Sequence, residues 1–288
     1  MISRMQVPQC SVGEGPVWDV EEQALYWIDI VGKKVFRLDH ATGQTREWQV
    51  PDIIGSLAVR QEGGLIVALA SGVHTLDLAT GECRMLATSP DLNDQVQLAD
   101  GKVDRRGRFI VGSSDRSMKD ARGKLYVLDP GADRLRAIDE GIILANGPCW
   151  SPDDRTLYHA DSLRKLIYAY DYDIEAGTAS NRREFADIEP FGGIPDGATV
   201  DADGGVWSAI CEGGKLVRFH ADGTLDRIVE MPAKLPGSVM FGGPDLDRLF
   251  VPTLSPAFMG RPAEPVDGCM FVVEDTGFRG LPEHRFAG

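Results

Sequence analysis

Short apolar runs separated by turns rich in Asp, Gly and Pro recur along the whole chain. Each unit reads as an apolar strand, a polar turn, a second strand rich in aromatic or β-branched residues, and a third strand before another turn. The first turns of the units begin near Asp19, Arg60, Asp104, Ser151, Asp201 and Pro244, at steps of 41, 44, 47, 50 and 43 residues. Units of about 40–50 residues with three or four short strands are typical of β-propeller blades. The pattern therefore predicts an all-β, six-bladed propeller with four-stranded blades around a central channel, formed as one domain over residues 1–288.

Alternation within the strands predicts which side chains face a neighbouring sheet. In the run Leu25-Tyr26-Trp27-Ile28, every second side chain points to the same face. For Trp18, Trp27, Trp150 and Trp207 we expect packing between blades rather than stacking on a ligand.

Composition narrows the classes of partner. The chain has 30 Lys+Arg and 44 Asp+Glu, a net charge of −14, so it should repel nucleic-acid phosphates and anionic lipid headgroups. A small-molecule partner suits it better, and we expect a monomer or weak homo-oligomer. Residues 1–15 hold no apolar run of signal-peptide length, which predicts a cytoplasmic protein that does not contact membranes. The five cysteines form no CxxC pair, which favours buried reduced thiols.

Four oxygen-bearing side chains come a few residues before four of the six turns: Glu14, Asp100, Asn146 and Asp196. The first strand of each blade lines the channel, so residues at matching places should meet at one end of it. Carboxylate and amide oxygens suit a hard cation such as Ca²⁺, Mg²⁺ or Mn²⁺. Any one of them alone is better explained as a turn residue. Their shared offset favours a metal site, because clustered like charges need a cation to offset them.

Several blocks of the chain resemble the SMP-30/gluconolactonase/regucalcin-like family, in the same order and spacing. These blocks are GEGPVWD, ADGKVDRRGRFIVG, NGPCWSPD, YHADSLRKLIYAYDYDIEAGTASNRR, PDGATVDADGGVW, FGGPDLDRLFV and the terminal FAG. The resemblance implies a six-bladed propeller with one divalent cation near the channel axis and hydrolysis of sugar lactones to aldonic acids. It places the metal ligands at Glu14, Asn146 and Asp196, with Ca²⁺ as the first choice and Mg²⁺, Mn²⁺ or Zn²⁺ as alternatives.

In such a site the cation polarises the lactone carbonyl, and a carboxylate takes a proton from the attacking water. Asp196 is the first candidate for this base, because the resemblance places it both on the metal and facing the substrate. Asp100 matches an aspartate that lies close to both the metal and the substrate, and it is the second candidate.

The chain departs from the family on the sugar-binding side. Where familiar members read Arg-x-Asn-Asp-Gly, this chain has Gln97 and Ala99 before Asp100. An acidic family residue further on also has no clear counterpart, since the match falls near Ser117, beside Arg116. We expect Gln97, Ala99, Asp100 and Arg116 to form the substrate side of the site, with a weaker grip on sugar hydroxyls than in relatives.

Three functions follow as alternatives. The first is a metal-dependent lactonase, and the second is a hydrolase of other esters, such as phosphotriesters, on the same metal site. The third is a non-enzymatic, calcium-binding propeller. The chain has no GxSxG elbow for serine-based hydrolysis.

Overall fold

Aspartates at the predicted turns close those turns with their own carboxylates. Asp19, Asp104 and Asp201 each accept hydrogen bonds from two backbone N–H groups two to four residues further on, at 2.7–3.1 Å. This is the Asx-turn arrangement, which fixes a tight reversal between two strands. The repeating positions read from the sequence are therefore the turns between the first and second strands of the blades.

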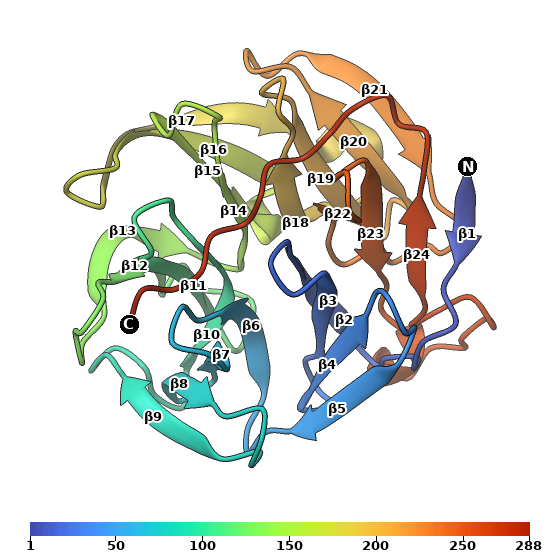
Figure 1. Cartoon of the computed structure of the whole chain (residues 1–288). Helices are drawn as coiled ribbons and strands as arrows, with labels where there is room; N and C mark the ends of the chain where they lie inside the picture. The colour runs from blue at the N-terminus through green and yellow to red at the C-terminus, as the bar shows by residue number, and fades with distance from the viewer.

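The computed structural model describes residues 1–288 and confirms the six-bladed β-propeller (Figure 1). Six four-stranded antiparallel sheets form the ring. Blade 1 comprises β2 (Gly13–Asp19), β3 (Ala24–Asp29), β4 (Lys34–Asp39) and β5 (Thr45–Gln49). Blade 2 comprises β6 (Ile54–Val59), β7 (Leu65–Leu69), β8 (Gly72–Leu76) and β9 (Cys83–Ala87). Blade 3 comprises β10 (Val96–Val103), β11 (Phe109–Asp115), β12 (Gly123–Leu128) and β13 (Arg136–Ile142).

The remaining blades follow the same order. Blade 4 comprises β14 (Ala145–Trp150), β15 (Thr156–Asp161), β16 (Leu166–Asp173) and β17 (Thr178–Asp187). Blade 5 comprises β18 (Ile194–Val200), β19 (Val206–Cys211), β20 (Lys215–Phe219) and β21 (Leu225–Glu230). Blade 6 comprises β22 (Met240–Gly242), β23 (Arg248–Pro252), β24 (Met270–Val273) and, as its outermost strand, β1 (Ile2–Arg4). The only helices are three short 3₁₀ turns: η1 (Ser162–Arg164), η2 (Glu189–Phe191) and η3 (Pro256–Met259).

The two ends of the chain close the ring within blade 6. Strand β1 pairs antiparallel with β24, with Ile2 opposite Val273 and Arg4 opposite Phe271. The fourth strand of this blade therefore comes from the opposite terminus of the chain.

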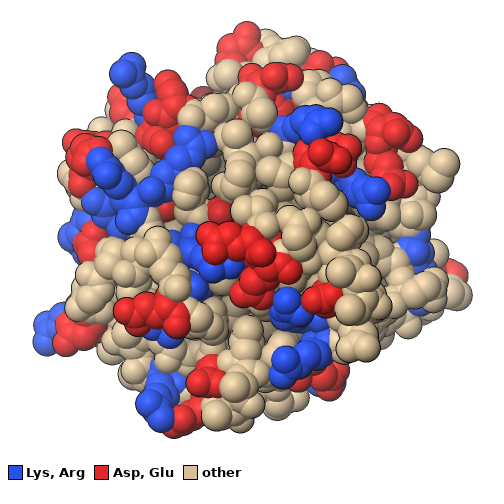
Figure 2. All heavy atoms as spheres, in the orientation of Figure 1, with Lys and Arg blue, Asp and Glu red and all other residues tan.

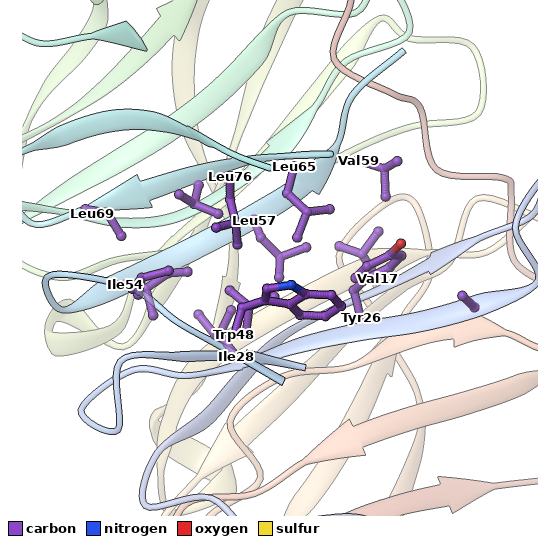
Figure 3. Packing of buried hydrophobic residues seen from close by; sticks show 14 residues of the cluster. Val17, Tyr26, Ile28, Trp48, Ile54, Leu57, Val59, Leu65, Leu69 and Leu76 are labelled. Carbon is purple, nitrogen blue, oxygen red and sulfur yellow. The ribbon is translucent and has the colours of Figure 1, made fainter. Parts of the chain in front are cut away.

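The hydrophobic core is divided among the six interfaces between neighbouring blades. Figure 3 shows the interface of blades 1 and 2, where Val17, Tyr26 and Trp48 meet Leu57 and Leu65. The five further interfaces each bury a cluster of their own.

Packing between blades, as predicted, is confirmed for Trp18, Trp27, Trp150 and Trp207. Trp18, Trp27 and Trp207 are at most 1% exposed and stack on or abut phenylalanine rings. Trp150 is half-buried against Tyr172. Trp27 and Trp207 lie on the second strands of their blades rather than the innermost ones.

Antiparallel order gives the channel two distinct ends. The first strands of the blades begin at one end, here called the site end, where the loops between second and third strands also lie. The turns between first and second strands lie at the other end, here called the distal end. Residues 280–288, the C-terminal strap, cross the face of the ring that is nearest the viewer in Figure 1.

The surface carries no large field of one charge on the face shown in Figure 2, where acidic and basic side chains are interspersed. No helix of the structure has the length and apolar character needed to cross a bilayer.

Candidate active site

Irregularities in four innermost strands set the direction of the predicted site residues. The strand register shifts between Glu14 and Val17, Leu98 and Gly101, Asn146 and Cys149, and Pro195 and Ala198. Such β-bulges bend a strand and re-aim a side chain. In β2 and β14 the bulge holds a Gly-Pro pair, and Gly15 and Gly147 have φ of 52° and 57°. Glycine adopts this left-handed backbone at no steric cost, so the Glu-Gly-Pro and Asn-Gly-Pro sequences build the bulges themselves.

The structure brings the four residues together, as the sequence predicts. Asp100 of blade 3 accepts a hydrogen bond from the Gly147 N–H of blade 4 on Oδ2 at 2.8 Å. The side chains of Glu14 and Asp196, from blades 1 and 5, lie close enough for the charge of Asp196 to raise the pKa of Glu14. A Cβ placed on Gly147 would come within 2.9 Å of the backbone oxygen of Asp196. Blades 1, 3, 4 and 5 therefore converge at the site end of the channel.

Local hydrogen bonds orient these side chains. Asn146 donates from Nδ2 to the hydroxyl of Ser162, a fully buried residue of η1, at 2.9 Å. Its amide oxygen is then the atom left to face a ligand. Oε2 of Glu14 accepts from the Gly15 N–H at 2.8 Å. A Cβ on Gly237 would come within 2.8 Å of Oε1 of the same carboxyl, so a glycine is needed at that position to make room for it.

The three carboxyl groups carry an electrostatic cost in the isolated chain. Glu14 is 5% exposed and Asp196 is 8% exposed. Burial first, and then repulsion from Asp196 and Asp100, raises the pKa of Glu14 well above its usual value. Burial and the charge of Asp100 likewise raise the pKa of Asp196, against contacts with Glu14 and Cys211 that lower it. Burial raises the pKa of Asp100, although hydrogen bonding from Gly147 and the charge of Lys102 oppose it.

These features fit a bound cation. A positive ion would remove the repulsion between the carboxylates, and all three predicted ligand side chains offer hard oxygen atoms. The chain has no group of three or more His, Cys, Asp or Glu side chains arranged to hold a metal. The candidate set of Glu14, Asn146 and Asp196 is of a different kind, with two carboxylates and one amide.

The residues predicted for the substrate side occupy different environments. Gln97 is half-buried on β10, opposite Ser114 of β11. Ala99 is half-buried too, but it packs against the apolar cluster between blades 3 and 4, and its backbone oxygen accepts from the Ser56 hydroxyl at 2.9 Å. Arg116 is exposed at the start of the β11–β12 loop.

Asp115 lies two residues before Ser117, the position near which the family has an acidic residue. Its carboxylate accepts hydrogen bonds from the Ser117 hydroxyl, the N–H groups of Lys119 and Asp120, and Arg122. These bonds, the one from Ser117 first, hold the pKa of Asp115 well below its usual range. All of its partners lie in the β11–β12 loop, so this carboxylate shapes the loop.

Three further residues of the site were not identified from the sequence. Ser162 orients Asn146, Cys211 lies close enough to Asp196 for each to affect the other's pKa, and Lys102 lies near Asp100. The five cysteines are unpaired, as predicted, and four are buried, Cys83 being half-buried. Lys102 could have been found, because it follows Asp100 by two residues on a strand that lines the channel. The closeness of Cys211 to Asp196 depends on the register of β18 against β19, for which the repeat pattern carries no signal.

Comparison with known proteins agrees with the propeller fold. The family model described as "SMP-30/Gluconolactonase/LRE-like region" matches residues 12–255. The chain is 34% identical over 287 residues to regucalcin of Danio rerio, covering 96% of this chain and 95% of that protein. It is 36% identical over 284 residues to a 6-deoxy-6-sulfogluconolactonase of Pseudomonas putida, with the same coverage. A solved luciferin-regenerating enzyme superposes with a TM-score of 0.93 at 25% identity, covering 100% of this chain and 99% of that one.

Proposed function

This chain belongs to the SMP-30/gluconolactonase/LRE-like family, and from that premise we propose that it is a divalent-cation-dependent lactonase. Its relatives support a lactonase-type activity. In more detail, we propose that Glu14, Asn146 and Asp196 hold one cation, with Ca²⁺ as the first choice. The proposed substrate is a sugar lactone or a related cyclic ester, which the enzyme opens to the hydroxy acid.

One observation carries the proposal. Glu14, Asp100 and Asp196 come from three different blades, and the charge of Asp100 raises the pKa of both buried carboxyl groups, Glu14 and Asp196. Burying several carboxylates without a positive partner is costly. A fold that retains this arrangement at the mouth of a channel is best explained by a cation that binds there.

The chain's own residues supply the remaining chemistry. A bound cation would act as a Lewis acid toward the lactone carbonyl and stabilise the charge that develops on its oxygen. In the proposed mechanism Asp196 accepts the proton of the attacking water, and Asp100 is the alternative base. Asp100 is already held on both oxygens, by the N–H groups of Gly101 and Gly147, which suits a positioning role better.

The rim of the site end supports a substrate with an apolar portion. Five of the nine exposed large apolar side chains of the chain lie on loops between second and third strands: Val31, Met118, Leu163, Phe258 and Met259. These loops belong to blades 1, 3, 4 and 6. With Gln97 and Ala99 in place of an arginine and an asparagine, we propose that the enzyme prefers a lactone less hydroxylated or more apolar than gluconolactone.

The test is a lactone panel followed by acid release with a pH indicator, in the presence of Ca²⁺, Mg²⁺, Mn²⁺ or Zn²⁺. The panel contains gluconolactone, an alkyl-substituted lactone, and a lactone bearing a sulfonate, which the exposed Arg116 would attract. Glu14→Gln, Asn146→Ala and Asp196→Asn should each weaken cation binding in calorimetry and abolish most hydrolysis. A protein that binds no stoichiometric cation and opens no lactone would refute the proposal. Cation binding without hydrolysis would instead support the non-enzymatic alternative, and hydrolysis of a phosphotriester alone would support the other ester hydrolase.

The substrate side is tested by the double variant Gln97→Arg with Ala99→Asn. Each hydrogen bond regained with a sugar hydroxyl should be worth about 0.5–1.5 kcal/mol, so kcat/KM for gluconolactone should rise relative to the apolar lactone. If the unaltered protein already prefers gluconolactone strongly and the variant changes nothing, these two positions do not contact the substrate.

A further inference from the structure

The C-terminal strap is bonded to turns at the distal end of the channel. It makes backbone hydrogen bonds from Gly280 to Leu246, from Phe286 to Val59, from Gln61 to Phe286 and from Ala287 to Gly107. These partners lie at turns between the first and second strands of blades 6, 2 and 3. Phe286 is 1% exposed and belongs to the cluster between blades 2 and 3. The strap is therefore an integral part of the fold at the end opposite the site.

Lys102 connects this end of the molecule to the site. It follows Asp100 by two residues on β10, and its Nζ donates to the backbone oxygen of Ala198 at 3.1 Å. Ala198 in turn follows Asp196 by two residues on β18. Because β14 lies between β10 and β18 in the ring, the lysine side chain reaches past one blade and bonds the next. It thus joins the two strands that carry Asp100 and Asp196.

The strap meets the same ammonium group from the distal side. Oε1 of Glu283 lies 3.7 Å from Nζ of Lys102, and the two side chains are only 18% and 12% exposed. Both residues line a cavity of about 40 Å³, together with Trp150 and Asp154. The Trp150 Nε1 and Asp154 Oδ1 atoms are buried there without a partner. At about 10–15 Å³ for each water, the cavity has room for roughly three or four waters that would satisfy these atoms.

The charges favour this arrangement. Lys102 is a partly desolvated cation close to the half-buried Asp100, and its charge lowers the pKa of Asp100 against the effect of burial. An ammonium with few water contacts keeps a fixed position only when acceptors hold it. Ala198 of blade 5 supplies one acceptor, and Glu283 of the strap supplies the other.

We propose that Lys102 is a positioning residue, held by Glu283 of the C-terminal strap, that fixes Asp100 relative to Asp196. The proposal rests on the proposed function for its catalytic meaning, but the positioning can be measured without any substrate. Through this lysine, a segment at the distal end helps to set the geometry of the site end.

The direct readout is amide hydrogen exchange at Gly147 in metal-free protein, because that N–H donates to Asp100 Oδ2. Lys102→Met keeps the aliphatic stem and removes the ammonium. It should speed exchange at Gly147 by about tenfold, roughly the value of a hydrogen bond to a charged group. Lys102→Arg should restore most of the protection. Glu283→Gln should produce a smaller change in the same direction, and the double variant should change no more than Lys102→Met alone.

Two further measurements separate positioning from general loosening. Ca²⁺ affinity by calorimetry should fall in Lys102→Met, and kcat should fall more than KM changes. The matched control is the pair Lys34–Glu47, which bonds at 2.9 Å on the outer strands of blade 1. Lys34→Met and Glu47→Gln should leave Gly147 exchange, cation affinity and kinetics unchanged.

The proposal is overturned if Lys102→Met folds with unchanged exchange at Gly147 and unchanged Ca²⁺ affinity. If that variant does not fold, Glu283→Gln decides, and unchanged Gly147 exchange in it has the same meaning. Faster exchange in a protein that opens no lactone would support the positioning and refute the proposed function, so the two failures can be told apart.

Discussion

His159 is the basis of a quantitative prediction about stability and pH. The residue lies on β15 opposite Tyr168, is completely buried, and has no hydrogen-bond partner on either ring nitrogen. Its Nε2 would lie 3.5 Å from a Cβ placed on Gly112 of blade 3, so the ring fills the interface of blades 3 and 4. Burial lowers the pKa of His159 from 6.5 to about 4. Attraction to Asp161 and Asp139 opposes this shift, and repulsion from Arg182 adds to it.

The sign and size of the effect follow from this shift. Above pH 6.5 the ring is neutral in both the folded and unfolded chains, and its titration contributes nothing. As the pH falls from 6.5 to 4, the unfolded chain binds a proton that the folded chain refuses, so the free energy of unfolding decreases. A shift of one pKa unit is worth about 1.4 kcal/mol, and the full shift here amounts to about 3 kcal/mol.

The assay is urea unfolding of wild type and His159→Leu, with chelator present, at intervals from pH 7.5 to pH 4. Other groups titrate in the same range, so the informative quantity is the difference between the two proteins at each pH. That difference should move by about 3 kcal/mol in favour of the variant as the pH falls from 6.5 to 4. His220→Leu, at an exposed position, reports the effect of removing a surface histidine. A difference that stays flat across the range would refute the reasoning.

Three other predictions concern the cation, the carboxylates and the strap. If the cation is present at 100 times its Kd, its removal by a chelator should lower Tm by roughly 5–10 °C. The strand signal in circular dichroism should persist, and complete unfolding on chelation would contradict this prediction. In metal-free protein, Glu14→Gln should be more stable than wild type, and this difference should grow as the pH rises above 4.5. The raised pKa of Glu14 in the folded chain costs wild type stability at pH values where Glu14 of the unfolded chain ionises. Urea unfolding at pH 5 and pH 8 checks this, and equal differences at both pH values would refute it. Phe286→Ala should lower the free energy of unfolding by about 3–5 kcal/mol, measured by urea unfolding against an exposed control, Met85→Ala.

Much of the fold could be predicted because a propeller repeats. The positions of Asp19, Asp104 and Asp201 mark the same turn in different blades, and one period therefore determines the number of sheets. The candidate site follows from the same regularity, since Glu14, Asn146 and Asp196 lie at matching points of the repeat.

Contacts that break the repeat could not be predicted in this way. The bond from Lys102 to Ala198 joins blades that are not neighbours, and the bond from Asn146 to Ser162 depends on a short 3₁₀ turn. The prediction that Ala99 lies on the substrate side came from the family resemblance and not from the repeat. The bulge between Leu98 and Gly101 alters the local direction of the side chains, and the half-buried Ala99 also contacts the apolar cluster between blades 3 and 4.

The closure of blade 6 by β1 also determines the order in which the ring can be completed during synthesis. Residue 270, the start of β24, follows residue 4, the end of β1, by 266 positions. At about 5–20 residues per second, the first strand waits roughly ten seconds to a minute for its partner. Throughout that interval β1 of the nascent chain has no partner strand. When β24 emerges, the unfinished sixth blade presents the free edge with which β1 pairs. Two chains that are translated together from one messenger RNA can exchange their β1 strands. A dimer with swapped β1 strands is therefore the misassembly that this architecture most favours.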